Sequence, residues 1–256
     1  RGRMVFWDVR HMREINTLSH PAAHGSIEAL ALDPQRHWVC AGTSNGYVAL
    51  WDTRFHVRLQ TWRTSNHARI RACALHPTRP HVLTVATSAV VSLDLGTGAV
   101  LETFYSREFG EHVPNITLES CADEAPSDTC WDGSYALCVG ADGYMSSPAE
   151  SPRGWIVTGG SDRVVRFWDL GRADTCTAFG SQIHGEFTMT HHRYMHTFQC
   201  VEAPTKRSPL HIHQQVRDAM GSLTSHQDTI TALAVIEAPY RCIVAGDRSG
   251  VLCVWE

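Results

Sequence analysis

The sequence has no hydrophobic run long enough to cross a membrane and no excess of basic charge. Its 256 residues include 22 lysines and arginines against 26 aspartates and glutamates, which gives a formal net charge of −4. A membrane-spanning helix needs about 18 or more consecutive apolar residues, and a nucleic-acid-binding domain is usually strongly basic. These absences argue against a membrane-spanning segment and against nucleic acid as a partner.

Several motifs of catalytic and metal sites are also missing. The nine cysteines form no C-x-x-C pair, and there is no P-loop, no H-E-x-x-H and no dinucleotide-binding glycine motif. A histidine-rich stretch at 191–196 lies in an irregular segment without matching cysteines, whereas zinc needs three or four ligands in fixed geometry. We therefore predict no enzymatic activity, no metal and no cofactor.

What the sequence does contain is a repeat. Five similar apolar segments end in Trp-Asp or a close variant, and the first three are 44 and 42 residues apart. The five segments are Met4–Asp8, Tyr47–Asp52, Val90–Asp94, Val164–Asp169 and Val251–Glu256. A WD40 blade has four strands in about 40–45 residues, and helical periodicity is nowhere sustained. We therefore predict an all-β protein built as a WD40 β-propeller.

The spacing divides the chain, 1–256, into blades of a single propeller domain. We expect complete blades at 26–62, 68–104 and 134–180, incomplete blades at 1–20 and 228–256, and insertions at 105–133 and 181–226. Because the first and last segments both resemble third strands, the expected architecture is part of a seven-bladed ring with N-terminal blades missing. The insertion at 181–226 has alternating segments typical of an extra hairpin.

Some residues are expected to be structural. WD40 blades often join a Trp, a Ser or Thr, an Asp and a His by hydrogen bonds, and buried polar groups of this kind must be paired. The expected structural blade residues are Trp7, Trp51, Asp52, Asp162, Trp168, Asp169 and Trp255. His24, His67 and His226 precede first strands, where the histidine of such a set would lie.

The order of the blade motifs carries a resemblance. Gly42-Thr43-Ser44, Trp51–Phe55, Ala68–Arg71 and Gly160–Asp162 with Arg166–Leu170 resemble the WD40 domain of one family. That family is the regulatory, pseudokinase-like vacuolar-protein-sorting subunit of the class III phosphatidylinositol 3-kinase complex. The resemblance implies a non-catalytic scaffold that contacts coiled-coil adaptor subunits and the lipid kinase complex in endosomal sorting and autophagy. It also implies a cytoplasmic protein that reaches endosomal or autophagic membranes only through the complex.

Two other functions stay open at this point: an unrelated WD40 adaptor, such as a ubiquitin-ligase substrate receptor, and a phosphoinositide-binding propeller. Candidate partner-binding residues are Arg54, Phe55, Arg69 and Arg71, which recur near blade ends or strand starts. Arginine and aromatic side chains are enriched at interface hot spots. The competing interpretation is that these side chains are solvated or pack one blade on another.

Overall fold

The computed structural model describes residues 2–64, 68–87, 89–106, 116–118, 133–140, 154–179, 183–192, 195–204, 226–236 and 242–255. Their regular structure is strand, with two single-turn 3₁₀ helices at Ala22–His24 and Ala173–Thr175. The prediction of an all-β protein is confirmed. Among these residues, no helix has the length and hydropathy to span a membrane.

The strands form five sheets, called blades 1 to 5 here, and within each blade consecutive strands pair antiparallel. Blade 1 contains β1 (Arg3–Asp8) and β2 (Arg13–Ser19). Blade 2 contains β3 (Ile27–Leu32), β4 (Trp38–Thr43), β5 (Tyr47–Asp52) and β6 (Val57–Thr64). Blade 3 contains β7 (Ala72–Leu75), β8 (Val82–Ala86), β9 (Val90–Asp94) and β10 (Val100–Ser106). Blade 4 contains β12 (Ser134–Gly140), β13 (Trp155–Gly160), β14 (Val165–Asp169) and β15 (Thr177–Phe179), and blade 5 contains β18 (Ile230–Ile236), β19 (Cys242–Asp247) and β20 (Leu252–Trp255).

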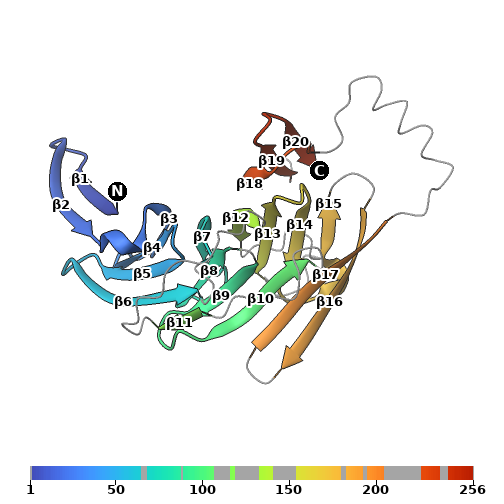
Figure 1. The fold of residues 1–256 in the computed structure, drawn as a ribbon, viewed down its shortest axis with the longest axis horizontal. Coiled ribbons are helices and arrows are strands. Elements are labelled where there is room, and N and C mark those ends of the chain that lie inside the picture. Colours follow the sequence, from blue (N-terminus) through green and yellow to red (C-terminus); the bar gives the residue numbers. More distant parts are fainter. Residues whose placement is uncertain are drawn as a thin grey trace.

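The first strands of blades 2 to 5 lie side by side: β3 against β7, β7 against β12, and β12 against β18. The blades therefore stack around a common axis, as in a propeller. In Figure 1 they follow one another along an arc, from blade 1 in blue at the left to blade 5 in red. A repeat of this kind cannot bury both of its faces alone, so each blade depends on its neighbours.

Buried apolar side chains fill the spaces between blades. One cluster, which includes Trp62 and Leu83, joins blades 2 and 3, and another, which includes Phe167 and Ile243, joins blades 4 and 5. Glycines in the second strands permit the close approach. A Cβ on Gly42 would lie 2.3 Å from Cγ2 of Ile70, the side chain just before the next blade. A Cβ on Gly159 would likewise lie 2.7 Å from Cγ2 of Ile230, the first residue of β18 in blade 5.

Both insertions add strands to the outer edge of an earlier blade. From the insertion at 105–133, β11 (Ile116–Leu118) pairs antiparallel with β6 of blade 2. From 181–226, the hairpin of β16 (Ile183–His192) and β17 (Met195–Pro204) joins blade 3 through parallel pairing of β17 with β10. The added strands satisfy backbone groups that an open edge would expose.

The hairpin also connects two blades through aromatic side chains. Phe198 of β17 stacks on Phe104 of β10 with ring centroids 4.6 Å apart, and Phe104 meets Trp168 of blade 4 edge-on at 5.6 Å. Phe187 of β16 contacts the same Trp168 at 5.3 Å. The predicted hairpin is therefore present, and it stabilises the junction between blades 3 and 4.

Candidate protein-binding rim

An aspartate ends the third strand of blades 2, 3 and 4 and also ends β1 of blade 1, and each of these aspartates holds the turn that follows. In each case one carboxylate oxygen accepts hydrogen bonds from the N–H groups two and three positions later, at 2.7 to 3.3 Å. The four residues are Asp8, Asp52, Asp94 and Asp169. Hydrogen bonds from Thr97 lower the pKa of Asp94, and the Arg54 guanidinium lowers that of Asp52. This local bonding explains why an aspartate recurs at the end of these segments.

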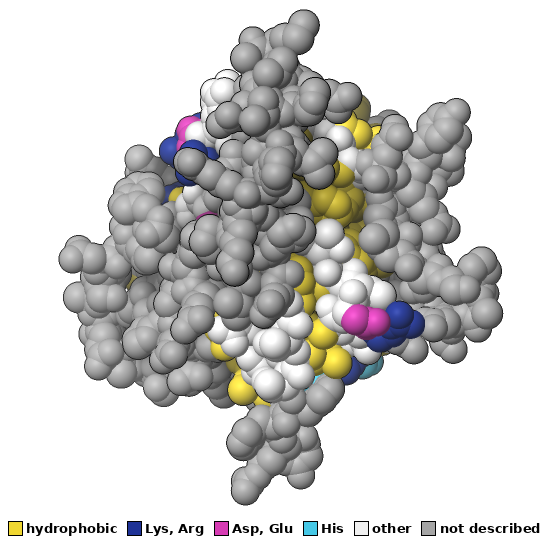
Figure 2. Space-filling model, turned by 90° about the vertical axis from the view of Figure 1, so that its right-hand side faces the viewer, with side chains coloured by type: hydrophobic (Ala, Val, Ile, Leu, Met, Phe, Trp, Pro, Cys, Tyr) yellow, Lys and Arg dark blue, Asp and Glu magenta, His cyan; other side chains and the backbone are white. Residues whose placement is uncertain are grey.

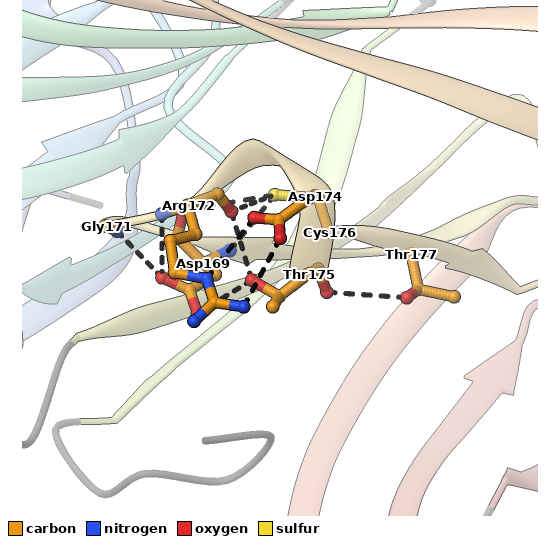
Figure 3. Close-up of polar contacts among 7 residues, drawn as sticks. All are labelled: Asp169, Gly171, Arg172, Asp174, Thr175, Cys176 and Thr177. Carbon is orange, nitrogen blue, oxygen red and sulfur yellow. Dashed lines mark hydrogen bonds and ion pairs between the residues drawn. The ribbon is translucent and has the colours of Figure 1, made fainter. Parts of the chain in front are cut away.

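The turn after β14 shows the arrangement in full (Figure 3). Asp169 also accepts a hydrogen bond from the Thr175 hydroxyl at 2.8 Å, and the Cys176 thiol lies 3.4 Å from the carbonyl oxygen of Arg172. Burial raises the pKa of Cys176 to about 12, so this thiol is neutral at physiological pH. The contacts close the turn on itself, which is a structural role.

Blade 4 holds a buried polar set behind the predicted tryptophan. The indole N–H of Trp168 donates to the Thr158 hydroxyl at 2.9 Å. Asp162, expected to be the acid of this set, forms a buried ion pair with Arg166, its partner four residues later. The buried charges are thus paired within blade 4.

The predicted histidines have different surroundings. His226 lies 3.3 Å from Asp247, and this carboxylate also accepts N–H groups from 227 and 228. The acid paired with this histidine is therefore Asp247. His24 stacks on Tyr47 with ring centroids 4.0 Å apart, and His67 lies outside the described residues.

The remaining predicted tryptophans differ in burial. Trp51 is buried between blades 1 and 2, and Trp255 packs on Phe179 of blade 4 with ring centroids 5.7 Å apart. Trp7 is 57% exposed, whereas Met4 and Phe6 of the same strand pack against blade 2.

One motif was missed in the sequence. Residues 42–46 match the G-x-S-x-G spacing of a hydrolase nucleophile elbow, which places its serine on a strand-to-helix turn. Here the segment joins β4 to β5, two antiparallel strands, so no helix follows the serine. The Ser44 hydroxyl donates to Asn45 and accepts the N–H of Ser26. The match belongs to a hairpin turn, and the structure gives it a structural role.

Three turns of blades 1 and 2 meet at one edge of the molecule. We call residues 8–13, 33–37 and 52–58 the arginine rim. The N–H of Thr53 donates to the carbonyl of His37 at 2.9 Å, which joins the second and third turns. His56 and Phe6, the latter next to the first turn, have ring centroids 6.0 Å apart.

The rim presents cations and apolar groups to solvent. Five exposed arginines lie in the rim: Arg10, Arg13, Arg36, Arg54 and Arg58. Of these, only Arg54 has a carboxylate partner among the described residues, Asp52 at 2.8 Å. Phe55 is 71% exposed and Met12 76% exposed. By contrast, the described atoms on the face in Figure 2 are mostly hydrophobic or uncharged, with charges in small groups.

The other two predicted binding residues lie near the axis and contact neighbouring blades. Arg69, before β7, forms an ion pair with Glu28 of blade 2. Arg71 lies over the ring of Tyr135 in blade 4, with its guanidinium carbon 4.0 Å from the ring centroid. The structure thus separates the four candidates: Arg54 and Phe55 are on the outer rim, whereas Arg69 and Arg71 connect blades.

Comparisons with known proteins bear on the identity of the repeats. The family model described as "WD domain, G-beta repeat" matches residues 13–52 and 151–169. The chain is 22% identical, over 99% of its length, to the "Putative serine/threonine-protein kinase VPS15" of Komagataella pastoris and covers 20% of that protein. It is also 22% identical over 98% of its length to the VPS15 of Arabidopsis thaliana, covering 19% of it. A 66-residue part is 38% identical to the "Probable serine/threonine-protein kinase vps15" of Dictyostelium discoideum, covering 26% of this chain and 3% of that protein.

The chain carries WD40 repeats and is homologous to VPS15. The resemblance predicted from the blade motifs is confirmed. The chain spans about a fifth of the length of the VPS15 proteins that match nearly all of it. The VPS15 alignments cover the rim as well as the axis, because they include 98% and 99% of the chain.

Proposed function

We propose that the chain is a non-catalytic protein-interaction scaffold of the class III phosphatidylinositol 3-kinase complex. In this role it holds coiled-coil adaptor subunits and the lipid kinase, and it serves endosomal sorting and autophagy. It is cytoplasmic and reaches endosomal or autophagic membranes through the complex. The observation that carries the proposal is the homology to VPS15 along nearly the whole chain, on a fold of WD40 blades.

The described geometry supports a binding role rather than a catalytic one. In blades 4 and 5 the buried Asp162 pairs with Arg166 and Asp247 with His226. The aspartate that ends β14 is occupied by backbone N–H groups. Among the described residues, no group of three His, Cys, Asp or Glu side chains is placed to hold a metal ion. The homology also disfavours an unrelated WD40 adaptor.

The test is a pull-down of the adaptor coiled coil by the full-length protein, by a form without the propeller, and by the double variant Arg54→Ala, Phe55→Ala. Deleting the propeller should abolish or strongly weaken capture. The double variant should lose roughly 1–4 kcal/mol of binding free energy if both side chains are hot spots. Its melting curve should stay close to that of the parent, because both side chains are exposed. Undiminished capture after propeller deletion refutes the proposal.

A further inference from the structure

The three turns of the arginine rim share an unusual backbone feature. Met12, Arg36 and His56 have φ values of 49°, 61° and 58°, in the left-handed region. Among the described non-glycine residues the only other one is Arg163, with φ of 65°. Glycine adopts this backbone without steric cost, whereas a Cβ makes it unfavourable. Each rim turn therefore carries a side chain where glycine would form the turn more easily.

Packing within the chain does not account for these side chains. Met12 is 76% exposed and Arg36 is exposed, so both residues lie mostly in solvent in the described fold. Only His56 has a ring contact, with Phe6. Because three such side chains gather at one edge and two of them are directed to solvent, we take them to point to a use outside the chain.

The charges of the rim indicate the chemistry of a partner surface. Its aspartates, Asp8, Asp33 and Asp52, are buried or half-buried and accept backbone N–H groups of their own turns. Four of the five exposed arginines have no carboxylate partner among the described residues. A guanidinium fork binds a carboxylate through two parallel hydrogen bonds. The complementary surface is therefore acidic, with apolar groups to cover Met12 and Phe55.

We propose that the arginine rim binds an acidic amphipathic helix of a protein partner, with Arg36 and its neighbouring arginines pairing to carboxylates and Met12 with Phe55 on the apolar stripe. This rests on the proposed scaffold function and names the chemistry of the partner. A helix fits because it presents acidic and apolar side chains together at i, i+3 and i+4. An extended segment would bind along a strand edge, whereas the rim consists of turn ends.

A membrane surface fits less well than a helix. An anionic bilayer attracts net positive charge and responds to clusters of cations. The charges of Asp8, Asp33 and Asp52 offset three of the five arginine charges, although their oxygens are occupied within their own turns. The summed field of the rim is therefore weak, and recognition depends on direct pairs made by the arginines.

The test measures fluorescence anisotropy of a labelled synthetic amphipathic helical peptide, with glutamates flanking a leucine stripe, titrated with the full-length protein. A matched peptide with glutamine for glutamate is the neutral control. The variants are Met12→Gly and Arg36→Gly, with Arg163→Gly as a control that relieves the same backbone strain away from the rim. We expect each rim variant to weaken binding roughly tenfold, as for a hot-spot residue. Both should melt at or above the parental temperature, whereas Arg163→Gly should leave affinity unchanged.

Three results overturn the inference: parental affinity in both rim variants, binding of the glutamine peptide as tight as that of the glutamate peptide, or rim-dependent binding to phosphatidylserine vesicles in place of the peptide. The pull-down of the natural adaptor separates this from the proposed function. If the full-length protein with both rim changes still captures the adaptor, the rim inference fails and the scaffold function stands. If the unaltered protein captures no adaptor, the scaffold function fails.

Discussion

Replacing Phe198 by alanine should detach the β16–β17 hairpin from the two blades it connects. The phenyl ring is 2% exposed and stacks on Phe104 at 4.6 Å, which in turn contacts Trp168. Removing a buried phenyl ring costs about 3–5 kcal/mol, and about 2–4 °C of melting temperature accompanies each kcal/mol in a domain of this size. We therefore expect a drop of about 6–20 °C in the transition that includes blades 3 and 4.

The matched control is Phe55→Ala, the same substitution at a ring that is 71% exposed. It should change stability by about 0.5 kcal/mol or less. Thermal melts give the size of the effect, and hydrogen exchange gives its place, because protection should fall first in β10 and β17, which pair in parallel. Equal melts for the two variants, or unaltered protection in β17, would refute the role assigned to the hairpin.

Further predictions concern packing, charge and association. Gly42→Ala should destabilise the fold by about 1–3 kcal/mol in a denaturant melt, because the added Cβ meets Ile70. The double variant that also carries Ile70→Ala should recover part of this loss, because the clash is removed. The pKa of Asp94 is lower in the folded protein than in the unfolded chain, where it is about 4. Its ionised carboxylate therefore stabilises the fold above about pH 4, and this stabilisation is lost as the pH falls further. The contribution of Asp94 to thermal stability should therefore stay level down to about pH 4 and then fall, so below pH 4 the melting temperature of Asp94→Asn should fall less steeply than that of the parent. The outward faces of blades 1 and 5 expose Trp7 at 57% and Leu252 at 73%, so the 256-residue chain should self-associate in light scattering; a monomer at high concentration would contradict this.

The sequence by itself determined the strands and turns of each blade, because these depend on neighbouring residues. The Trp-Asp ending predicts a third strand and the turn after it, and the aspartate holds that turn through N–H groups only two and three positions away. Alternating apolar segments predicted the hairpin at 183–204 for the same reason. The exposure of Phe55 also follows from its place in a turn.

Only the tertiary structure decided which blade each added strand joins and which arginines face solvent. β17 pairs with β10, almost a hundred residues earlier, and strand periodicity carries no information about such a partner. Arg69 and Arg54 look alike in the sequence, yet Arg69 pairs with Glu28, 41 residues away, whereas Arg54 pairs within its own turn. The rim arises because three separate turns converge and adopt left-handed backbone at Met12, Arg36 and His56. Convergence depends on how whole blades pack, which no local pattern specifies.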